Sequence, residues 1–195
     1  MKEEMINIEA PSSEQLENEL IRVRYRERYG KLLKNTVYAL LVVAAVSVLI
    51  ATLVMPVLEI YGNSMNPTFQ NGDVVVSVKT TDLKRGDICC LYYNNHILVK
   101  RVIGLEGDEI LIDEDGRVFV NGKELDEPYV ERKMLGDCDI EFPYTVPEQT
   151  VFVLGDNRSN SEDSRNASIG CISNEEIVGK IVFRVWPLKS FGTVK

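Results

Sequence analysis

The chain has 195 residues, which suits one folded domain with an appendage, and its composition shows neither disorder-like nor repeat-like bias. The net charge is −8, and all of it lies in residues 59–195, which carry 15 basic and 23 acidic side chains. An acidic domain without a basic stripe argues against nucleic acid as a partner.

The first predicted element with a clear role is an uncharged run of 24 residues, 35–58 (NTVYALLVVAAVSVLIATLVMPVL). As a helix it would be about 36 Å long, enough to cross a hydrocarbon core of about 30 Å. A cleaved signal peptide fits less well, because the apolar part exceeds the usual length of about 7–15 residues and a segment of about 35 residues precedes it. We therefore expect one transmembrane anchor at 36–58.

The charges that flank this run predict its orientation. Only one acid, Glu27, lies among the basic side chains directly before it, and Glu59 is the first charge after it. Those basic side chains are Arg22, Arg24, Arg26, Arg28, Lys31 and Lys34. The positive-inside rule predicts a single-pass protein of the cell membrane, with residues 1–35 as a basic, amphipathic cytoplasmic tail and residues 59–195 outside. Residues 12–29 are expected to be helical, either along the inner leaflet or as a solvated charged helix.

From residue 72 onward, short β-branched or aromatic runs are separated by turn formers. The predicted strands are 74–78, 88–93, 97–103, 110–112, 118–120, 150–154 and 177–186. RVFVNGKEL (117–125) predicts a hairpin with a two-residue Asn-Gly turn. Without amphipathic helices between them, these strands predict an all-β antiparallel domain, a partly open barrel or coiled sheet. Residues 126–149 are interpreted as a long excursion between strands.

The four cysteines lie in this outer domain, where disulfides are permitted. Cys89 and Cys90 are neighbours in an apolar run and are expected to act as small hydrophobic residues. The spacing neither supports nor excludes a Cys138–Cys171 bridge. No CxxC or Cys/His ligand spacing occurs, so no metal site is expected.

A serine in the turn-like segment YGNSMNPTF (61–69) is a candidate nucleophile, and it needs a base to take its proton. The chain has one histidine, His96, and the other option is a lysine kept neutral by burial, since a lysine in water has a pKa of about 10.4. Lys100 in HILVKRVIG lies in an apolar strand. Alternation does not say whether Lys100 or Arg101 points inward, but only lysine can be neutralised by burial. A solvent-facing lysine on an edge strand is the simpler alternative.

The segment GDNRSNSEDSR (155–165) is by composition a polar loop after the strand TVFVL. A Ca²⁺ loop is excluded, because Arg158 stands where an acid or amide is required. Within the loop, Asp163 and Arg165 are candidates for a charge pair, and Ser161 is a candidate for holding an amine in position.

Four motifs follow the anchor in order: GNSMNPT, RGDI, KRVIGLEGD and GDNRSNSEDSR. Any one is weak, but together they are specific, and residues from about 37 to 186 resemble bacterial type I signal peptidase. The resemblance implies a membrane-anchored serine endopeptidase that removes signal peptides from secreted preproteins, without metal or cofactor. Its expected partners are signal-peptide-bearing preproteins and the lipid bilayer, and it is expected to be a monomer.

The resemblance also implies roles for single residues. Ser64 matches the nucleophile, Lys100 the general base, and Ser161 the residue that orients the lysine. The backbone N–H of Ser64 would serve the oxyanion, and Met65 and Phe69 are expected at an apolar surface near the site. The supporting positions are Gly62, Asp156, Asn157, Arg158, Asp163 and Arg165.

Two positions depart from the family pattern. Some members carry a serine at the position of Gly62, and losing that donor would cost up to about 10²–10³ in rate if nothing replaced it. Glu106 stands where a proline is common, which is expected to affect only a turn. His96 matches no catalytic position and is expected at the surface.

Three other readings compete with this one. The first is a catalytically inactive, membrane-tethered β-domain that binds peptides, which would be expected to lack Ser64 or Lys100. The second is a self-cleaving serine–lysine peptidase like the SOS repressors, which needs a DNA-binding module and a soluble chain. The third is a hydrolase built on His96.

Overall fold

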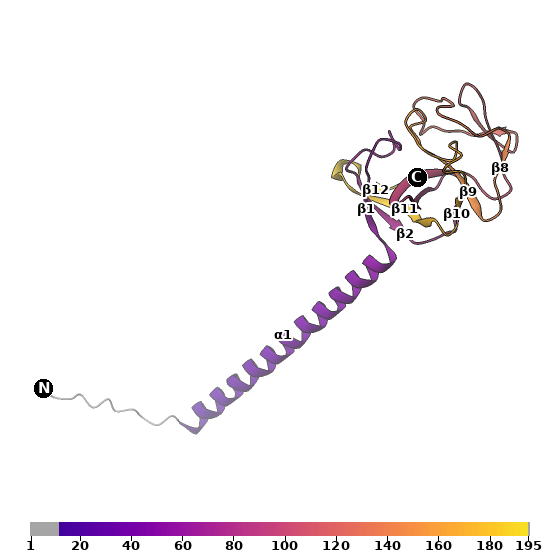
Figure 1. Ribbon diagram of the computed structural model, residues 1–195. Coiled ribbons are helices and arrows are strands. Elements are labelled where there is room, and N and C mark those ends of the chain that lie inside the picture. The colour runs from indigo at the N-terminus through magenta and orange to yellow at the C-terminus, as the bar shows by residue number, and fades with distance from the viewer. Residues whose placement is uncertain (1–11, 195) are drawn as a thin grey trace. The chain divides into compact units, whose positions relative to one another are not determined.

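The computed structural model describes residues 12–194, which divide into two compact units between residues 50 and 51 (Figure 1). The elements are α1 (Ser13–Val54), β1 (Val57–Glu59), β2 (Val74–Val78), β3 (Ile88–Tyr93), β4 (His96–Gly104), β5 (Glu109–Ile112), β6 (Val118–Val120), β7 (Lys123–Glu124), β8 (Tyr144–Thr145), β9 (Thr150–Leu154), β10 (Ile172–Ser173), β11 (Ile177–Trp186), the 3-10 helix η1 (Leu188–Ser190) and β12 (Gly192–Thr193).

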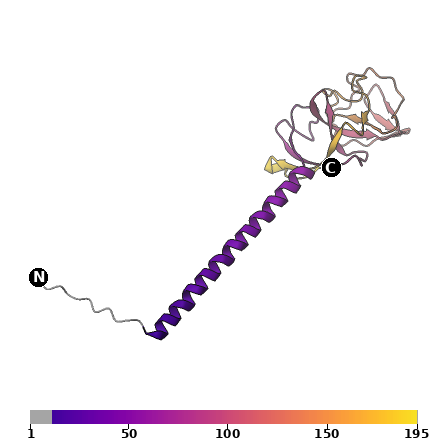
Figure 2. The same ribbon diagram turned by 60° about the horizontal axis from the view of Figure 1, so that its bottom comes forward.

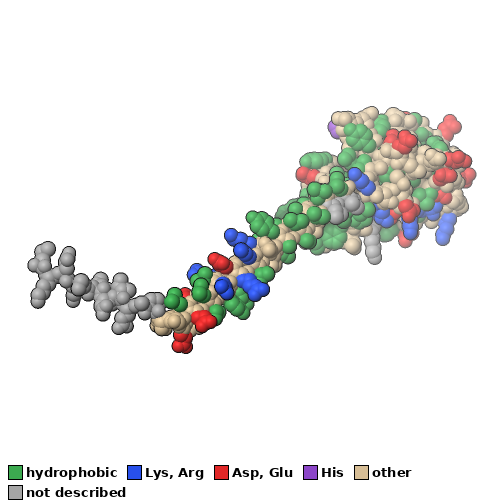
Figure 3. Space-filling view, turned by 90° about the horizontal axis from the view of Figure 1, so that it is seen from below, with side chains coloured by type: hydrophobic (Ala, Val, Ile, Leu, Met, Phe, Trp, Pro, Cys, Tyr) green, Lys and Arg blue, Asp and Glu red, His purple; other side chains and the backbone are tan. Residues whose placement is uncertain are grey.

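The helix α1 runs for 42 residues without interruption (Figure 2). Its first turn is closed by a capping box, in which the Gln15 N–H donates to Ser12 Oγ at 3.3 Å and the Ser12 N–H donates to Gln15 Oε1 at 3.0 Å. Charged side chains gather on its N-terminal half and hydrophobic ones on its C-terminal half (Figure 3). Within residues 12–194 it is the one helix long and apolar enough to cross a membrane.

The helix ends four residues before the expected end of the anchor. Pro56 has no N–H to donate and disfavours the helical conformation of Met55, so the helix stops at Val54. The residues after the helix join the larger sheet. The Pro56 carbonyl accepts a hydrogen bond from the Ser77 N–H at 3.0 Å, and β1 pairs with β2. The last apolar residues of the run, Val57 and Leu58, therefore belong to the sheet.

The strands that follow α1 form two antiparallel sheets. The larger follows the order β1-β2-β11-β3-β4-β9-β10, with β12 added to β11, and the smaller follows β7-β6-β5-β8. The long strand β11 has register shifts between Ile181 and Phe183 and between Arg184 and Trp186, which let it bend while pairing with β2. Neither sheet closes on itself, so the predicted all-β, partly open class with one N-terminal apolar helix is confirmed.

The predicted hairpin is confirmed in detail. β6 and β7 pair around Asn121 and Gly122, whose φ angles of 52° and 77° are both in the left-handed region that this two-residue turn requires. The strands that the sequence did not predict, such as β1, β8 in the excursion and β10, have only two or three residues each. Such short runs give no alternation to detect.

Met65 and Phe69 correct an expectation in part. They were expected at an apolar surface near the site, but they are 2% and 0% exposed and belong to a core cluster with Ile60, Val75 and Ile181. Of the two, only Met65 borders the space next to Ser64. The sequence shows that hydrophobic residues lie in this turn, but it does not show which side of the turn the sheet covers. Their burial fixes the turn that carries Ser64 to the interior of the domain.

Phe69→Ala is expected to lower the free energy of unfolding by about 3–5 kcal/mol, because it leaves a cavity in this cluster. Urea unfolding followed by the fluorescence of the single tryptophan, Trp186, measures it in the detergent-solubilised chain. Tyr61→Ala, at a side chain that is 77% exposed, is the control. Equal stability of the two variants would contradict the packing described here.

Candidate active site

Ser64 lies in the turn that follows β1. Gly62 enters this turn with φ +89°, in the left-handed region that favours glycine, and its N–H donates to Asn71 Oδ1 at 2.9 Å. The carbonyl of Ser64 accepts from the backbone N–H of Asn157 at 3.0 Å, and Asn157 Nδ2 donates to the Asn63 carbonyl at 3.1 Å. The polar loop after β9 therefore holds the backbone of the serine.

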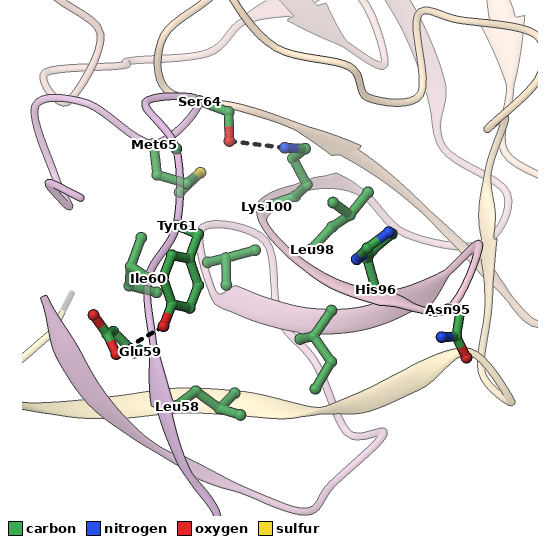
Figure 4. Close-up of a pocket in the computed structure, with 13 residues that line it drawn as sticks. Leu58, Glu59, Ile60, Tyr61, Ser64, Met65, Asn95, His96, Leu98 and Lys100 are labelled. Atoms are coloured by element: carbon green, nitrogen blue, oxygen red, sulfur yellow. Dashed lines mark hydrogen bonds between the residues drawn. The ribbon is translucent and has the colours of Figure 1, made fainter. Parts of the chain in front are cut away.

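Lys100 lies in the middle of β4 and is 3% exposed. Its Nζ donates to Ser64 Oγ at 2.9 Å (Figure 4). Burial lowers the pKa of this amine below its ordinary 10.5, although the negative charges of Asp163 and Glu162 act in the opposite direction. A buried amine with a lowered pKa can accept a proton from the hydroxyl that it touches.

Arg101, the next residue, is buried as well, on the other face of β4. Its Nε and Nη2 donate to the two oxygens of Asp156 at 2.9 and 2.7 Å, and its Nη1 donates to the Gly86 carbonyl at 2.8 Å. Thr68 Oγ1 donates to the same carboxylate at 2.5 Å. Lys100 and Arg101 are thus both buried, one against a hydroxyl and the other in an ion pair.

Two arginines of the GDNRSNSEDSR loop form further pairs with carboxylates. Asp163 accepts from Arg165 Nε and Nη2, both at 2.8 Å, and its Oδ2 also accepts the Gly155 N–H at 2.9 Å. Arg158 pairs with Glu127, and its Nε donates to the Gly155 carbonyl at 3.0 Å. The pairing of Arg165 with Asp163 was foreseen from the sequence, whereas the partner of Arg158 was not.

Ser161 borders the same pocket as Ser64 and Lys100, but the expected contact with the amine is not among the hydrogen bonds of residues 12–194. Its Oγ is buried and has no partner there. Ser161 and the backbone of Ser64 can both approach this part of the loop because residue 155 is a glycine. A Cβ on Gly155 would lie 2.1 Å from Ser161 Oγ and 2.5 Å from the Ser64 carbonyl oxygen. Gly155 was missed from the sequence, because nothing local marks such a close approach.

The Ser64–Lys100 pair lies where two pockets meet. A mostly apolar pocket of about 520 Å³ is lined on one side by the chain after α1 and on the other by the N-terminal half of β4 (Figure 4). Its apolar lining consists of Leu58, Ile60, Tyr61, Met65, Ile97, Leu98 and Val99. A polar pocket of about 390 Å³ shares Gly62, Ser64, Leu98 and Lys100 with it and continues over Asn63, Asp137 and residues 158–162.

The structure also places the other residues that the sequence singled out. His96 is exposed at the start of β4, as expected. Glu106 takes part in a turn, where its Oε2 accepts from the Gln149 N–H at 2.8 Å. Cys138 and Cys171, both within the described part of the chain, are free thiols, as are the buried Cys89 and Cys90.

A serine hydroxyl in contact with a buried amine is the arrangement that serine–lysine hydrolases use. The chain belongs to the signal peptidase family, peptidase S26, whose model matches residues 33–186. It is 39% identical over 146 residues to signal peptidase I of Bacillus caldolyticus, which covers 67% of this chain and 79% of that protein. It is 38% identical over 152 residues to signal peptidase IB of Staphylococcus aureus strain COL, covering 68% of this chain and 78% of that protein.

A crystal structure of a signal peptidase I from Enterococcus faecalis V583 aligns with 51% of this chain and 96% of that one, at 29% identity and a TM-score of 0.43. The family resemblance seen in the sequence is confirmed by the family match and the relatives. The chain is therefore a peptidase of the family that removes signal peptides from preproteins.

Gly155→Ala is expected to lower kcat/KM for a model preprotein by up to about 100-fold, because the new methyl group must displace the Ser64 backbone or Ser161. Cleavage by the full chain in vesicles measures it, with Trp186 fluorescence as a check on folding. Gly30→Ala, in the helix, where a Cβ meets nothing within 4 Å, is the control. Unchanged cleavage by Gly155→Ala would contradict the close approach.

Proposed function

We propose that this peptidase is a membrane-anchored serine endopeptidase that cleaves signal peptides through a Ser64–Lys100 dyad. The observation that carries the proposal is the 2.9 Å contact between Lys100 Nζ and Ser64 Oγ, made by an amine that is 3% exposed. The proposal assigns no chemical role to His96.

In the proposed mechanism, neutral Lys100 takes the proton of Ser64 Oγ as the oxygen attacks the carbonyl carbon at the cleavage site. The backbone N–H of Ser64 donates to the oxyanion of the tetrahedral intermediate. The ammonium of Lys100 then gives its proton to the leaving amine, which departs as the N-terminus of the mature protein. Water, deprotonated by Lys100, attacks the acyl-enzyme. The bond between the acyl carbon and Ser64 Oγ breaks, Lys100 returns the proton to Oγ, and the signal peptide leaves with a new carboxylate.

The pairing of β4 supports a mode of substrate binding. Its residues 96–101 pair with β3 on one side, whereas the pairing with β9 on the other side begins only at Arg101. The N-terminal half of β4 therefore offers backbone groups to an extended peptide, which can add to it as a further strand. The neighbouring apolar pocket would receive the small side chains at positions −1 and −3 of the signal peptide.

The proposed topology rests on α1 and its flanking charges. Residues 1–35 form the cytoplasmic tail, residues 36–58 the anchor, and residues 59–195 the extracytoplasmic peptidase domain. The helical part of the anchor ends at Val54. Enzyme and signal peptide would then meet within one bilayer, and a monomer suffices for the reaction.

Ser64→Ala and Lys100→Ala are each expected to lower kcat for a model preprotein by more than about 10³-fold, because each removes one half of the proton transfer. Cleavage by the full chain in lipid vesicles is the measurement. Ser190→Ala and Lys189→Ala, at exposed positions far along the chain, are matched controls. Retained turnover in Lys100→Ala would overturn the assignment of the base.

The rate of the wild-type enzyme is expected to rise with pH along an acid limb that reports the deprotonation of Lys100. Because burial lowers the pKa of this amine, the limb should lie below the ordinary value of 10.5. kcat/KM measured from acidic to alkaline pH locates it. A rate that begins to rise only around pH 10.5 would contradict a base neutralised by burial.

A further inference from the structure

A short segment of the long excursion between β7 and β8 lies against the active site without being part of it. In Asp126–Val130 (DEPYV), Glu127 is 4% exposed although no strand or helix includes it. Tyr129, two residues later, is half-buried. A buried carboxylate in an irregular segment needs a charged partner, and here the partner belongs to the polar loop that holds Ser64.

Glu127 and Arg158 form an almost completely enclosed ion pair, with side chains 0% and 1% exposed. Arg158 Nη2 donates to Glu127 Oε1 at 2.5 Å and its Nη1 donates to Oε2 at 3.3 Å, while the hydroxyl of Tyr129 donates to Oε1 at 3.3 Å. The remaining nitrogen, Nε, donates to the Gly155 carbonyl. Glu127 thus neutralises and orients the arginine that holds the backbone at Gly155.

Tyr129 acts on the second arginine. Its ring centre lies 3.8 Å from Cζ of Arg101, which pairs with Asp156 and directly follows Lys100 in β4. The face of an aromatic ring stabilises a guanidinium and keeps water from it. One segment of the chain therefore contacts two of the three buried arginines that hold the loop.

The two contacts converge on Ser64 through three consecutive residues. Arg158 holds the carbonyl of Gly155, Arg101 holds the side chain of Asp156, and the N–H of Asn157 donates to the Ser64 carbonyl. Movement of either arginine would shift this stretch and the serine bonded to it. A displacement of about 1 Å at the reacting atoms is enough to cost about 100-fold in rate.

We propose that Glu127 and Tyr129 form a clamp that positions the Ser64–Lys100 pair, with Glu127 acting through Arg158 and Tyr129 through Arg101. Neither clamp residue touches the reacting atoms, so both are positioning residues. The proposal rests on the proposed catalytic roles of Ser64 and Lys100.

The charge of Glu127 gives the clamp an effect on the pH dependence of the reaction, which a purely structural role would not have. Arg158 and Lys100 line the same polar pocket. The groups that already act on the pKa of the Lys100 amine are Asp163, Glu162, Cys89 and Arg165. When Glu127 is made neutral, Arg158 becomes an unpaired buried cation beside them, and a nearby positive charge lowers the pKa of an amine.

The test compares Glu127→Gln with Glu124→Gln in the full chain, in vesicles, with a model preprotein. Glu124 is the matched control, because its carboxylate pairs with Lys133 at the surface. Glu127→Gln is expected to lower kcat per active site by up to about 100-fold with little change in KM, and to move the acid limb of kcat/KM to lower pH. The double variant Glu127→Gln/Arg158→Gln removes the unpaired charge, so its limb should return toward that of the wild type.

Active sites are counted with a reagent that acylates Ser64, which separates a lower rate per site from a smaller folded fraction. A wild-type rate per site and an unmoved limb in Glu127→Gln would overturn the clamp. If Trp186 fluorescence shows that this variant does not fold, Tyr129→Leu decides: a lower kcat per site supports the clamp, and an unchanged one overturns it. Failure of the underlying dyad would look different, since the wild type would lack the acid limb or Lys100→Ala would retain turnover.

Discussion

The active site depends on keeping the Lys100 amine out of water while leaving it in contact with the Ser64 hydroxyl, where the two pockets meet. Strand β4 meets both demands by placing two adjacent basic residues on opposite faces. Lys100 is buried against Ser64, so its charge is disfavoured, whereas Arg101 is buried in an ion pair with Asp156. The difference between the two residues comes from their partners as much as from their burial.

The serine half of the pair lies in a turn, and its position is set by loops. Three buried arginine–carboxylate pairs surround it, and each arginine also donates to a backbone carbonyl. The pairs are Arg101–Asp156, Arg158–Glu127 and Arg165–Asp163. Buried ion pairs often add little net stability compared with apolar side chains of the same size, so these pairs make more sense as devices that fix geometry. The three pairs hold the irregular backbone of these loops in place, as the hydrogen bonds between neighbouring strands hold a sheet.

The sequence predicted the features with local causes. Strands of five or more residues, the Asn-Gly hairpin and the helix follow from composition, period and turn chemistry, and the order of the motifs led to Ser64 and Lys100. Features made by long-range contacts were not predictable. The burial of Met65 and Phe69 depends on how β2 and β11 cover the turn, and the closeness of Gly155 to the Ser64 carbonyl joins segments about 90 residues apart in the chain. Nothing in the sequence marked Glu127 as part of the site, because its pairing with Arg158 is visible only in the folded structure.

The most direct test measures the protonation of Lys100 itself. In Ser64→Ala protein carrying ¹⁵N-labelled lysine, the Nζ resonance can be followed against pH by NMR and assigned by its loss in Lys100→Arg. The account predicts a single lysine that titrates below the ordinary value of 10.5. A Lys100 amine that titrates together with the exposed lysines would contradict it.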